Sequence, residues 1–179
     1  MDEIVLQAMH KWPNVPHCYG WLGLDARGRW CLRDADTQLQ GVFPQSKGEV
    51  LEHEKLVAFI GRNYTQDDRG CWYFQNGPQR VFVELEAAPW VLRIHAEGAV
   101  QTHTGQWVHP TECVVDRAGR AYLATSVGVG LVHSLDTGLL AERLERGDWP
   151  VRELAQPDPS VEYGYVCSPQ ALQNGALTC

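Results

Sequence analysis

Histidine and cysteine are the residues of this chain that could hold a metal ion, and it has seven histidines and six cysteines. The densest group is His103, His109 and Cys113. A zinc site needs three or four ligands that converge at about 2.0–2.3 Å. A glycine and a proline interrupt this group, so strand parity does not bring its members together, and no C-x-x-C or H-x-x-x-H spacing occurs. The sequence therefore predicts no metal site.

Searches for a nucleophile also give no catalytic group. No G-x-S-x-G elbow is present, and Cys18 beside His17 is the single adjacent thiol–imidazole pair, in which neighbouring side chains point apart. Residues 126–131 (SVGVGL) contain G-x-G but lack the third glycine and the Lys-Ser/Thr of phosphate loops. Those glycines indicate a close strand crossing or bend, with a phosphate cradle as the alternative. We predict no catalytic residues and no cofactor.

The best candidate for a site is the stretch from Trp72 to Trp90, with its polar turn at residues 76–80 (NGPQR). One interpretation makes the aromatic residues core and Gln79 and Arg80 a solvated rim. The other uses planar side chains to stack on a flat heterocycle, with arginine binding its anionic tail. The residues predicted to bind such a ligand are Trp72, Asn76, Gln79, Arg80, Arg93, His133 and Arg143.

Three D-x-x-G sequences indicate tight hairpin turns, beginning at Asp25, Asp67 and Asp116. In such turns the aspartate accepts hydrogen bonds from nearby backbone amides, and glycine takes the positive φ. The flanking residues alternate in polarity, as in half-buried strands. A cation-binding loop is the alternative, but each copy has at most two carboxylates and lacks the terminal glutamate of a calcium loop.

Helical periodicity is present in residues 46–64 and 136–146, with Asp136 as the expected N-cap, and a short helix is expected over 3–10. The residues from 156 onward indicate an ordered loop that ends in a short strand. On the strand with Glu84 and Glu86 we expect these two acids on the solvent side. The turn at residues 95–98 is expected to separate two related α+β halves, 1–96 and 97–179, each with an antiparallel sheet and one main helix.

Composition narrows the class of protein. The chain is 44% hydrophobic and 21% charged, as in folded soluble proteins. Its net charge is −7 and no lysine or arginine cluster occurs, which disfavours a nucleic-acid polymer as partner. No apolar run reaches the roughly 18–20 residues of a membrane span, and no signal peptide is evident. We therefore expect a cytoplasmic protein with reduced thiols and no membrane partner.

Several stretches resemble an uncharacterised proteobacterial family, a domain of unknown function. Residues 24–30 (LDARGRW) are similar to its I-D-x-x-G-x-W, 51–59 to its apolar helix, 68–74 (DRGCWYF) to its D-G-x-Y motif, and 85–90 (LEAAPW) to its E-D-A-P-F. Gln79 and Ala87 depart from acidic residues of that pattern, which indicates a sister family. The resemblance implies a duplicated α+β fold with a C-terminal half like pleckstrin-homology (PH) folds. It also implies a ligand pocket between the halves, a nucleotide-like ligand and a role in signalling.

The leading hypothesis is a non-enzymatic protein that binds a small ligand at the junction of its halves. The second is a protein–protein interaction module whose exposed tryptophans dock a protein partner. The third is an enzyme of unknown reaction.

Overall fold

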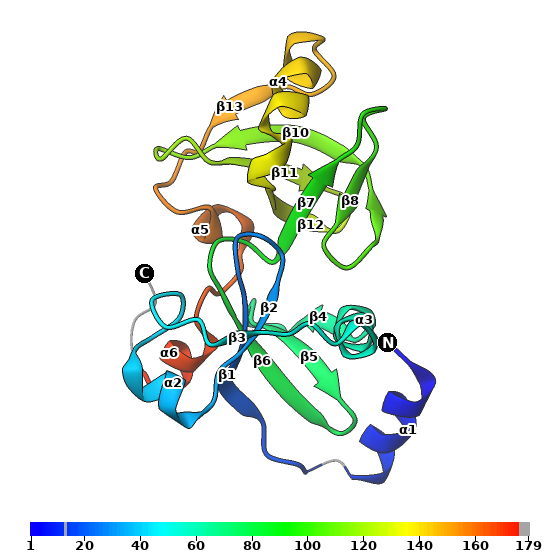
Figure 1. Cartoon of the computed structure of the whole chain (residues 1–179), viewed down its shortest axis with the longest axis vertical. Helices are drawn as coiled ribbons and strands as arrows, with labels where there is room; N and C mark the ends of the chain where they lie inside the picture. Colours follow the sequence, from blue (N-terminus) through cyan, green and yellow to red (C-terminus); the bar gives the residue numbers. More distant parts are fainter. Residues whose placement is uncertain (13, 176–179) are drawn as a thin grey trace. The chain divides into compact units, whose positions relative to one another are not determined.

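The computed structural model describes residues 1–12 and 14–175, and the chain forms two compact units. Unit 1 contains Met1–Asp25, Arg29–Glu86 and the described residues from Tyr165 onward, and unit 2 contains Ala26–Gly28 and Ala87–Gly164. Each unit has its own strand-rich sheet and few helices (Figure 1). The fold class is therefore mixed α+β with two sheets, as expected from the sequence.

The sheet of unit 1 has six strands in the order β3-β2-β1-β6-β5-β4. These are β1 (Cys18–Leu24), β2 (Trp30–Leu32), β3 (Glu49–Val50), β4 (Tyr64–Gln66), β5 (Trp72–Asn76) and β6 (Gln79–Leu85). The central pair, β1 and β6, is parallel, and the other neighbours are antiparallel. Because β1 and β6 lie between other strands, their residues can be buried on both faces, and Leu22, Phe82 and Val83 are.

The helices of unit 1 are α1 (Glu3–Lys11), α2 (Ala35–Gln40), α3 (Glu54–Arg62) and α6 (Pro169–Gln173). A side chain caps the N-terminus of three of them: Asp34 caps α2, His53 caps α3 and Ser168 caps α6. Such caps satisfy amide groups that have no partner inside a helix.

The pleat divides the side chains of this sheet between two faces. On the face that we call the α3 face, Leu22, Phe74 and Val81 share a side, and Phe59 of α3 packs edge-to-face on Phe74 at 5.5 Å between ring centroids. On the opposite face, the α6 face, Cys71, Tyr73 and Phe82 form a buried cluster that Leu172 of α6 covers.

Unit 2 has a seven-stranded sheet in the order β13-β10-β11-β12-β7-β8-β9. Its strands are β7 (Trp90–Ile94), β8 (Val100–Thr102), β9 (Trp107–Val108), β10 (Pro110–Val115), β11 (Ala121–Thr125), β12 (Gly128–Val132) and β13 (Val151–Glu153). Its helices are η1 (Ser134–Asp136), α4 (Thr137–Glu145) and α5 (Pro159–Tyr163). The two sheets differ in strand number and order, and the duplication stays a prediction of the resemblance. The expectation of antiparallel sheets was wrong, because β1 and β6 pair in parallel in unit 1, as do β7 and β12 and β10 and β13 in unit 2.

The three predicted D-x-x-G turns are confirmed. Asp25, Asp67 and Asp116 each accept hydrogen bonds from backbone amides two or four residues further along the chain. The glycine of each turn has a positive φ, at 76° for Gly28, 84° for Gly70 and 78° for Gly119. Each aspartate therefore supplies the acceptors that the turn's amides need, which is the role that its residue type predicted.

The three predicted helices are present, and two of them begin later than expected. The helix expected over 3–10 is α1, and the one expected within 46–64 begins only at Glu54, because residues 49–50 pair with β2. The helix expected from 136 is α4. Asp136 occupies its N-cap position but gives no side-chain cap, since its carboxylate is bound to Arg93 and to the backbone N–H of Ile94.

The turn at residues 95–98 does not separate two blocks, because it joins β7 to β8 inside the sheet of unit 2. The units therefore divide differently from the expected halves 1–96 and 97–179: the boundary follows Glu86, and the chain returns to unit 1 at Tyr165. The expectation of a C-terminal loop was also wrong for residues 156–175, and the chain end at which a short strand was expected lies outside the described residues. Residues 156–175 form α5 and α6, each begun by Asp-Pro or Ser-Pro, in which the first residue caps and proline fits the first helical turn.

Glu84 corrects the expectation of a solvated acidic strand face, because it is only 2% exposed. Its carboxylate accepts hydrogen bonds from the hydroxyl of Ser168 and the backbone N–H of Gln170, at the start of α6. Burial raises the pKa of Glu84, although these hydrogen bonds and the charge of Arg33 act in the opposite direction. The buried acid therefore joins the C-terminal segment to the sheet.

Candidate functional site

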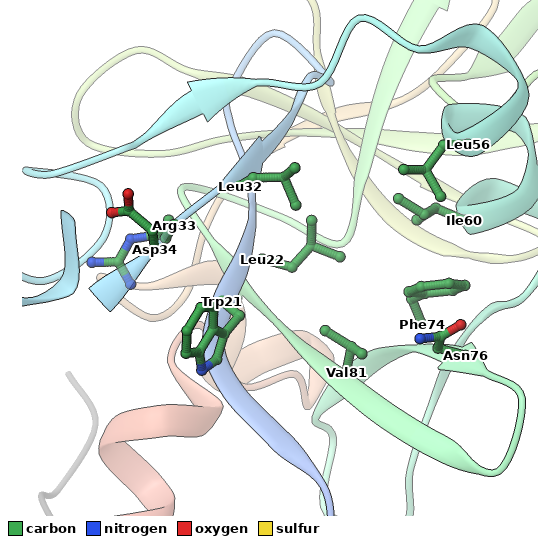
Figure 2. Close-up of a pocket in the computed structure, with 10 residues that line it drawn as sticks. All are labelled: Trp21, Leu22, Leu32, Arg33, Asp34, Leu56, Ile60, Phe74, Asn76 and Val81. Atoms are coloured by element: carbon green, nitrogen blue, oxygen red, sulfur yellow. The ribbon is translucent and has the colours of Figure 1, made fainter. Parts of the chain in front are cut away.

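The candidate site is a pocket in unit 1 where α3 covers only part of its face of the sheet. We call it the α3 pocket, and its volume is about 430 Å³. Its lining residues are Trp21, Leu22, Leu32, Arg33, Asp34, Leu56, Ile60, Phe74, Asn76 and Val81 (Figure 2). Leu56 and Ile60 of α3 face Leu22 and Leu32 across the pocket, with Val81 and Phe74 of the sheet between them (Figure 2).

The strand pattern explains why the pocket wall is apolar. Leu22 pairs with Leu32 on one side and with Val83 on the other, so branched side chains align across neighbouring strands. Trp21 also lines the pocket, although it adjoins Leu22 and consecutive strand residues normally point to opposite faces. The register of β1 with β6 shifts between Cys18 and Leu22, as in a β-bulge, and Gly20 has a φ of 78°.

Three apolar side chains of the wall are open to solvent. Trp21 is 48% exposed, Leu32 is 46% exposed and Leu56 is 38% exposed. By contrast, Leu22, Ile60 and Phe74 are buried and form the base. The wall therefore offers apolar surface that an occupant would remove from water.

The polar residues of the pocket differ in whether their side chains are free to form hydrogen bonds with an occupant. The guanidinium of Arg33 donates to the carbonyl oxygens of Gly20, Gly41 and Ser46 at 2.9, 2.7 and 2.9 Å. The carboxylate of Asp34 accepts from the N–H of Thr37, at the start of α2. Asn76 is exposed, and its side chain has no hydrogen-bond partner among the described residues. The Asn76 amide is thus the polar group at this pocket that an occupant could use.

The four predicted ligand-binding residues of unit 1 do not converge. Asn76 lines the α3 pocket, whereas Trp72 is buried on the same face against Tyr64, at 4.7 Å between ring centroids. Gln79 donates its amide to the carbonyl of Pro16 at 2.8 Å. Arg80 lies on the α6 face, because the register pairs it with Gln75 on the side opposite Asn76.

The other three predicted residues belong to unit 2 and have partners there. Arg93 donates to both carboxylate oxygens of Asp136 at 2.6 and 3.1 Å. His133 accepts from the N–H of Leu135 through Nδ1 at 3.1 Å, which caps η1. Arg143 donates to the carbonyl of Ala96 at 2.7 Å. These contacts give each side chain a structural role, and ligand binding by the seven residues stays a prediction.

Sequence reasoning missed the apolar residues of the α3 pocket. Trp21 and Leu22 are adjacent apolar residues in a strand, a signal that both faces of that strand carry apolar side chains. Leu56 belongs to the apolar stripe of the predicted helix, so its position was recognised but its exposure was not. These residues come from segments that are far apart in the sequence, and only the folded chain brings them to one pocket.

The described residues contain no group of three His, Cys, Asp or Glu side chains placed to hold a metal ion. The five cysteines in this part of the chain are free thiols, and three of them are buried: Cys31, Cys71 and Cys113. No helix among residues 1–12 and 14–175 is both long and apolar enough to cross a membrane.

The fold and the pocket define a two-unit α+β protein with an apolar recess in unit 1. The chain belongs to the family DUF2944, described as "Protein of unknown function (DUF2946)", whose model matches residues 1–170. Membership of a family of unknown function is thus confirmed. The proteobacterial distribution and the PH-like half stay predictions.

No curated protein matches the sequence. Two solved structures are similar to the chain, both of DUF1285 family proteins. The one from Silicibacter pomeroyi DSS-3 has a TM-score of 0.49 and 15% identity, and the match covers 79% of this chain and 84% of that chain. The one from Shewanella baltica OS155 has a TM-score of 0.48 and 16% identity, over 69% of this chain and 91% of that chain. At these TM-scores neither likeness supports a statement about function.

Proposed function

We propose that unit 1 binds a small, largely apolar molecule in the α3 pocket. The observation that carries this proposal is the half-open apolar wall, in which Trp21, Leu32 and Leu56 are each more than a third exposed. Ligand pockets are concave and mainly apolar, with a few polar groups that orient the ligand and volumes of roughly 300–1,000 Å³. The α3 pocket, at about 430 Å³, falls in this range.

The polar groups at the pocket narrow the chemistry of the ligand. Arg33 uses its guanidinium on three backbone carbonyls, so it supplies no unused cation for a phosphate. Asn76 offers one neutral amide. A neutral molecule with one polar end suits this arrangement better than a nucleotide does. The nucleotide-like ligand was expected from the planar side chains, the arginines and the family resemblance, and the signalling role from the resemblance; both stay predictions, as does the junction site.

The test is a titration with 1-N-phenylnaphthylamine, a neutral apolar dye whose fluorescence rises on leaving water. We expect saturable binding to the wild type at one site. Leu32→Gln places a polar amide in the wall and removes apolar contact, which should weaken binding about tenfold, equivalent to about 1.4 kcal/mol. Leu39→Gln is the matched control, because Leu39 is exposed in α2 and does not line the pocket.

Equal loss of dye binding in the two variants would assign it to general surface hydrophobicity and contradict the proposal. Absence of saturable binding to the wild type would do the same. The alternative function, docking of an apolar side chain from a protein partner, draws on the same exposed Trp21. It would be favoured if the dye fails to bind while Trp21→Ser abolishes a complex that wild-type protein forms in the cell.

A further inference from the structure

The α6 face carries a second group of side chains, around the start of β6. Tyr19 stacks on Phe82 with a centroid distance of 4.5 Å and an interplanar angle of 5°. Tyr73 also contacts Phe82, at 5.6 Å, and the guanidinium of Arg80 lies over the Tyr73 ring at 4.6 Å. Phe82 is buried, so the two tyrosines and Arg80 rest on a rigid base.

Within residues 1–12 and 14–175, Arg80 differs from most arginines because it has no carboxylate partner. Its guanidinium contacts the Tyr73 ring, and among these residues it makes no hydrogen bond or ion pair. Stacking on an aromatic face holds a guanidinium in place and leaves its N–H edge available. That edge has the geometry for a two-pronged contact with an oxyanion.

Arg69 and His17 lie in the same region as Arg80, and of these two Arg69 carries a positive charge. Arg69 is half exposed, and a hydrogen bond with Tyr19 raises the pKa of its guanidinium; it also forms an ion pair with Asp67 at 3.4 Å. His17 packs on Phe82 at 5.9 Å between ring centroids. The amide contact from Gln79 to Pro16, the residue before His17, fixes this loop against β6.

The charges of Arg80 and Arg69 act on the imidazole of His17. Burial lowers the pKa of its imidazole first, and the positive charges of Arg80 and Arg69 lower it further. The two arginines therefore create a local positive potential, although the chain as a whole carries a net charge of −7.

We propose that Arg80 and Arg69, supported by Tyr73 and Tyr19, form a binding site for the phosphate group of a small molecule. Arg80 supplies the two-pronged contact and Arg69 a second positive charge. The site lies on the face of the sheet opposite the α3 pocket, and so it is independent of the function proposed above. The phosphate can be free or can belong to an organic phosphate.

The test is an isothermal titration of the full chain with pyrophosphate and, separately, with AMP at low ionic strength. We expect Arg80→Gln and Arg69→Gln each to weaken binding at least tenfold. Arg117→Gln is the control, because Arg117 is an exposed arginine of the third D-x-x-G turn, in unit 2. Circular dichroism and the melting temperature of each variant show that it is folded.

Tighter binding of AMP than of pyrophosphate would identify an organic phosphate as the ligand, and the reverse order would identify a free phosphate. Both results support the site. Two results would overturn it: no binding of either probe to the wild type, or the same loss in Arg117→Gln as in Arg80→Gln, which would indicate unspecific attraction. Dye binding at the α3 pocket should stay unchanged in Arg80→Gln.

Discussion

Glu84 and Ser168 are 84 positions apart in the sequence, yet the hydroxyl of Ser168 donates a hydrogen bond to the buried carboxylate of Glu84. The same carboxylate accepts from the N–H of Gln170 at 3.0 Å. These two hydrogen bonds hold the start of α6 against the sheet. The contact makes the C-terminal segment part of unit 1.

This contact predicts a pH dependence. Burial raises the pKa of Glu84 above its ordinary 4.5, so the folded chain holds this proton more tightly than the unfolded chain does. The contribution of Glu84 to the free energy of unfolding is then complete below about pH 4.5 and decreases as pH rises through the folded pKa. Each whole unit by which folding raises the pKa of Glu84 corresponds to about 1.4 kcal/mol in the free energy of unfolding.

Glu84→Gln keeps a neutral side chain of the same shape, so it escapes this loss. The free energy of unfolding of the variant minus that of the wild type should therefore rise with pH above about 4.5, as urea denaturation at successive pH values would measure. Glu153→Gln, an exposed acid of β13, is the control and should give a flat difference. A flat difference for Glu84→Gln as well would contradict the raised pKa.

The ion pair of Arg93 and Asp136 predicts unequal effects of its two partners. The Asp136 side chain is 5% exposed and also accepts from the N–H of Ile94 at 3.0 Å, whereas that of Arg93 is 48% exposed. Asp136→Ala leaves a buried N–H without its acceptor and should lower the free energy of unfolding by about 2–3 kcal/mol. Arg93→Ala should cost about 1 kcal/mol, since its partner's charge keeps a hydrogen bond and the pair is screened by water. Chemical denaturation measures both, and equal costs would show that the Ile94 contact contributes nothing.

Two glycines with the same backbone angle should respond differently to alanine. Gly119 has a φ of 78° and open space around the added methyl group, so Gly119→Ala should cost roughly 1–2 kcal/mol from the backbone conformation alone. Gly48 has a φ of 79°, but its added methyl group would lie 2.1 Å from the carbonyl oxygen of Leu32. Gly48→Ala should therefore cost roughly 1–3 kcal/mol more. Thermal melting of the two variants compares them, and similar melting temperatures would mean that the β2–β3 connection moves freely.

The free thiols should differ in reactivity. Burial raises the pKa of Cys71 and of Cys113 to about 11, while Cys18 and Cys167 are partly exposed. Because the thiolate is the reactive form, a brief treatment with a maleimide at pH 7 should label Cys18 and Cys167 well before the other two. Mass spectrometry of the digested protein measures the order in which the cysteines are labelled. Labelling in guanidinium should remove the difference, and fast native labelling of Cys71 would contradict its burial.

The parts of the fold that the sequence predicted are those controlled by neighbouring residues. The turns at Asp25, Asp67 and Asp116 were recognised because the aspartate and its glycine act within five residues. The burial of Glu84 was not, because its partners lie more than eighty residues away. The alternation of acidic residues along a strand depends only on the local sequence, so it does not predict that a helix from a distant segment covers one of them.

Of the residues that line the α3 pocket, the sequence analysis predicted only Asn76 as a ligand-binding residue. The remaining wall depends on how α3 crosses the sheet and on residues of β1 and β2 from distant parts of the sequence. Arg80 was predicted to bind the same ligand as Asn76, but the pleat places it on the face opposite Asn76. The residue types were therefore informative, and the grouping of the residues was not.

The return of residues 165–175 to unit 1 has a consequence for synthesis of the chain. Unit 1 contains residues from both sides of unit 2, so a growing chain can complete the sheet of unit 2 before α6 exists. During that interval the cluster of Cys71, Tyr73 and Phe82 lacks the cover of Leu172. Unit 1, although its first strands are made first, is the unit that finishes folding last, and its uncovered face is where a nascent chain would need protection from aggregation.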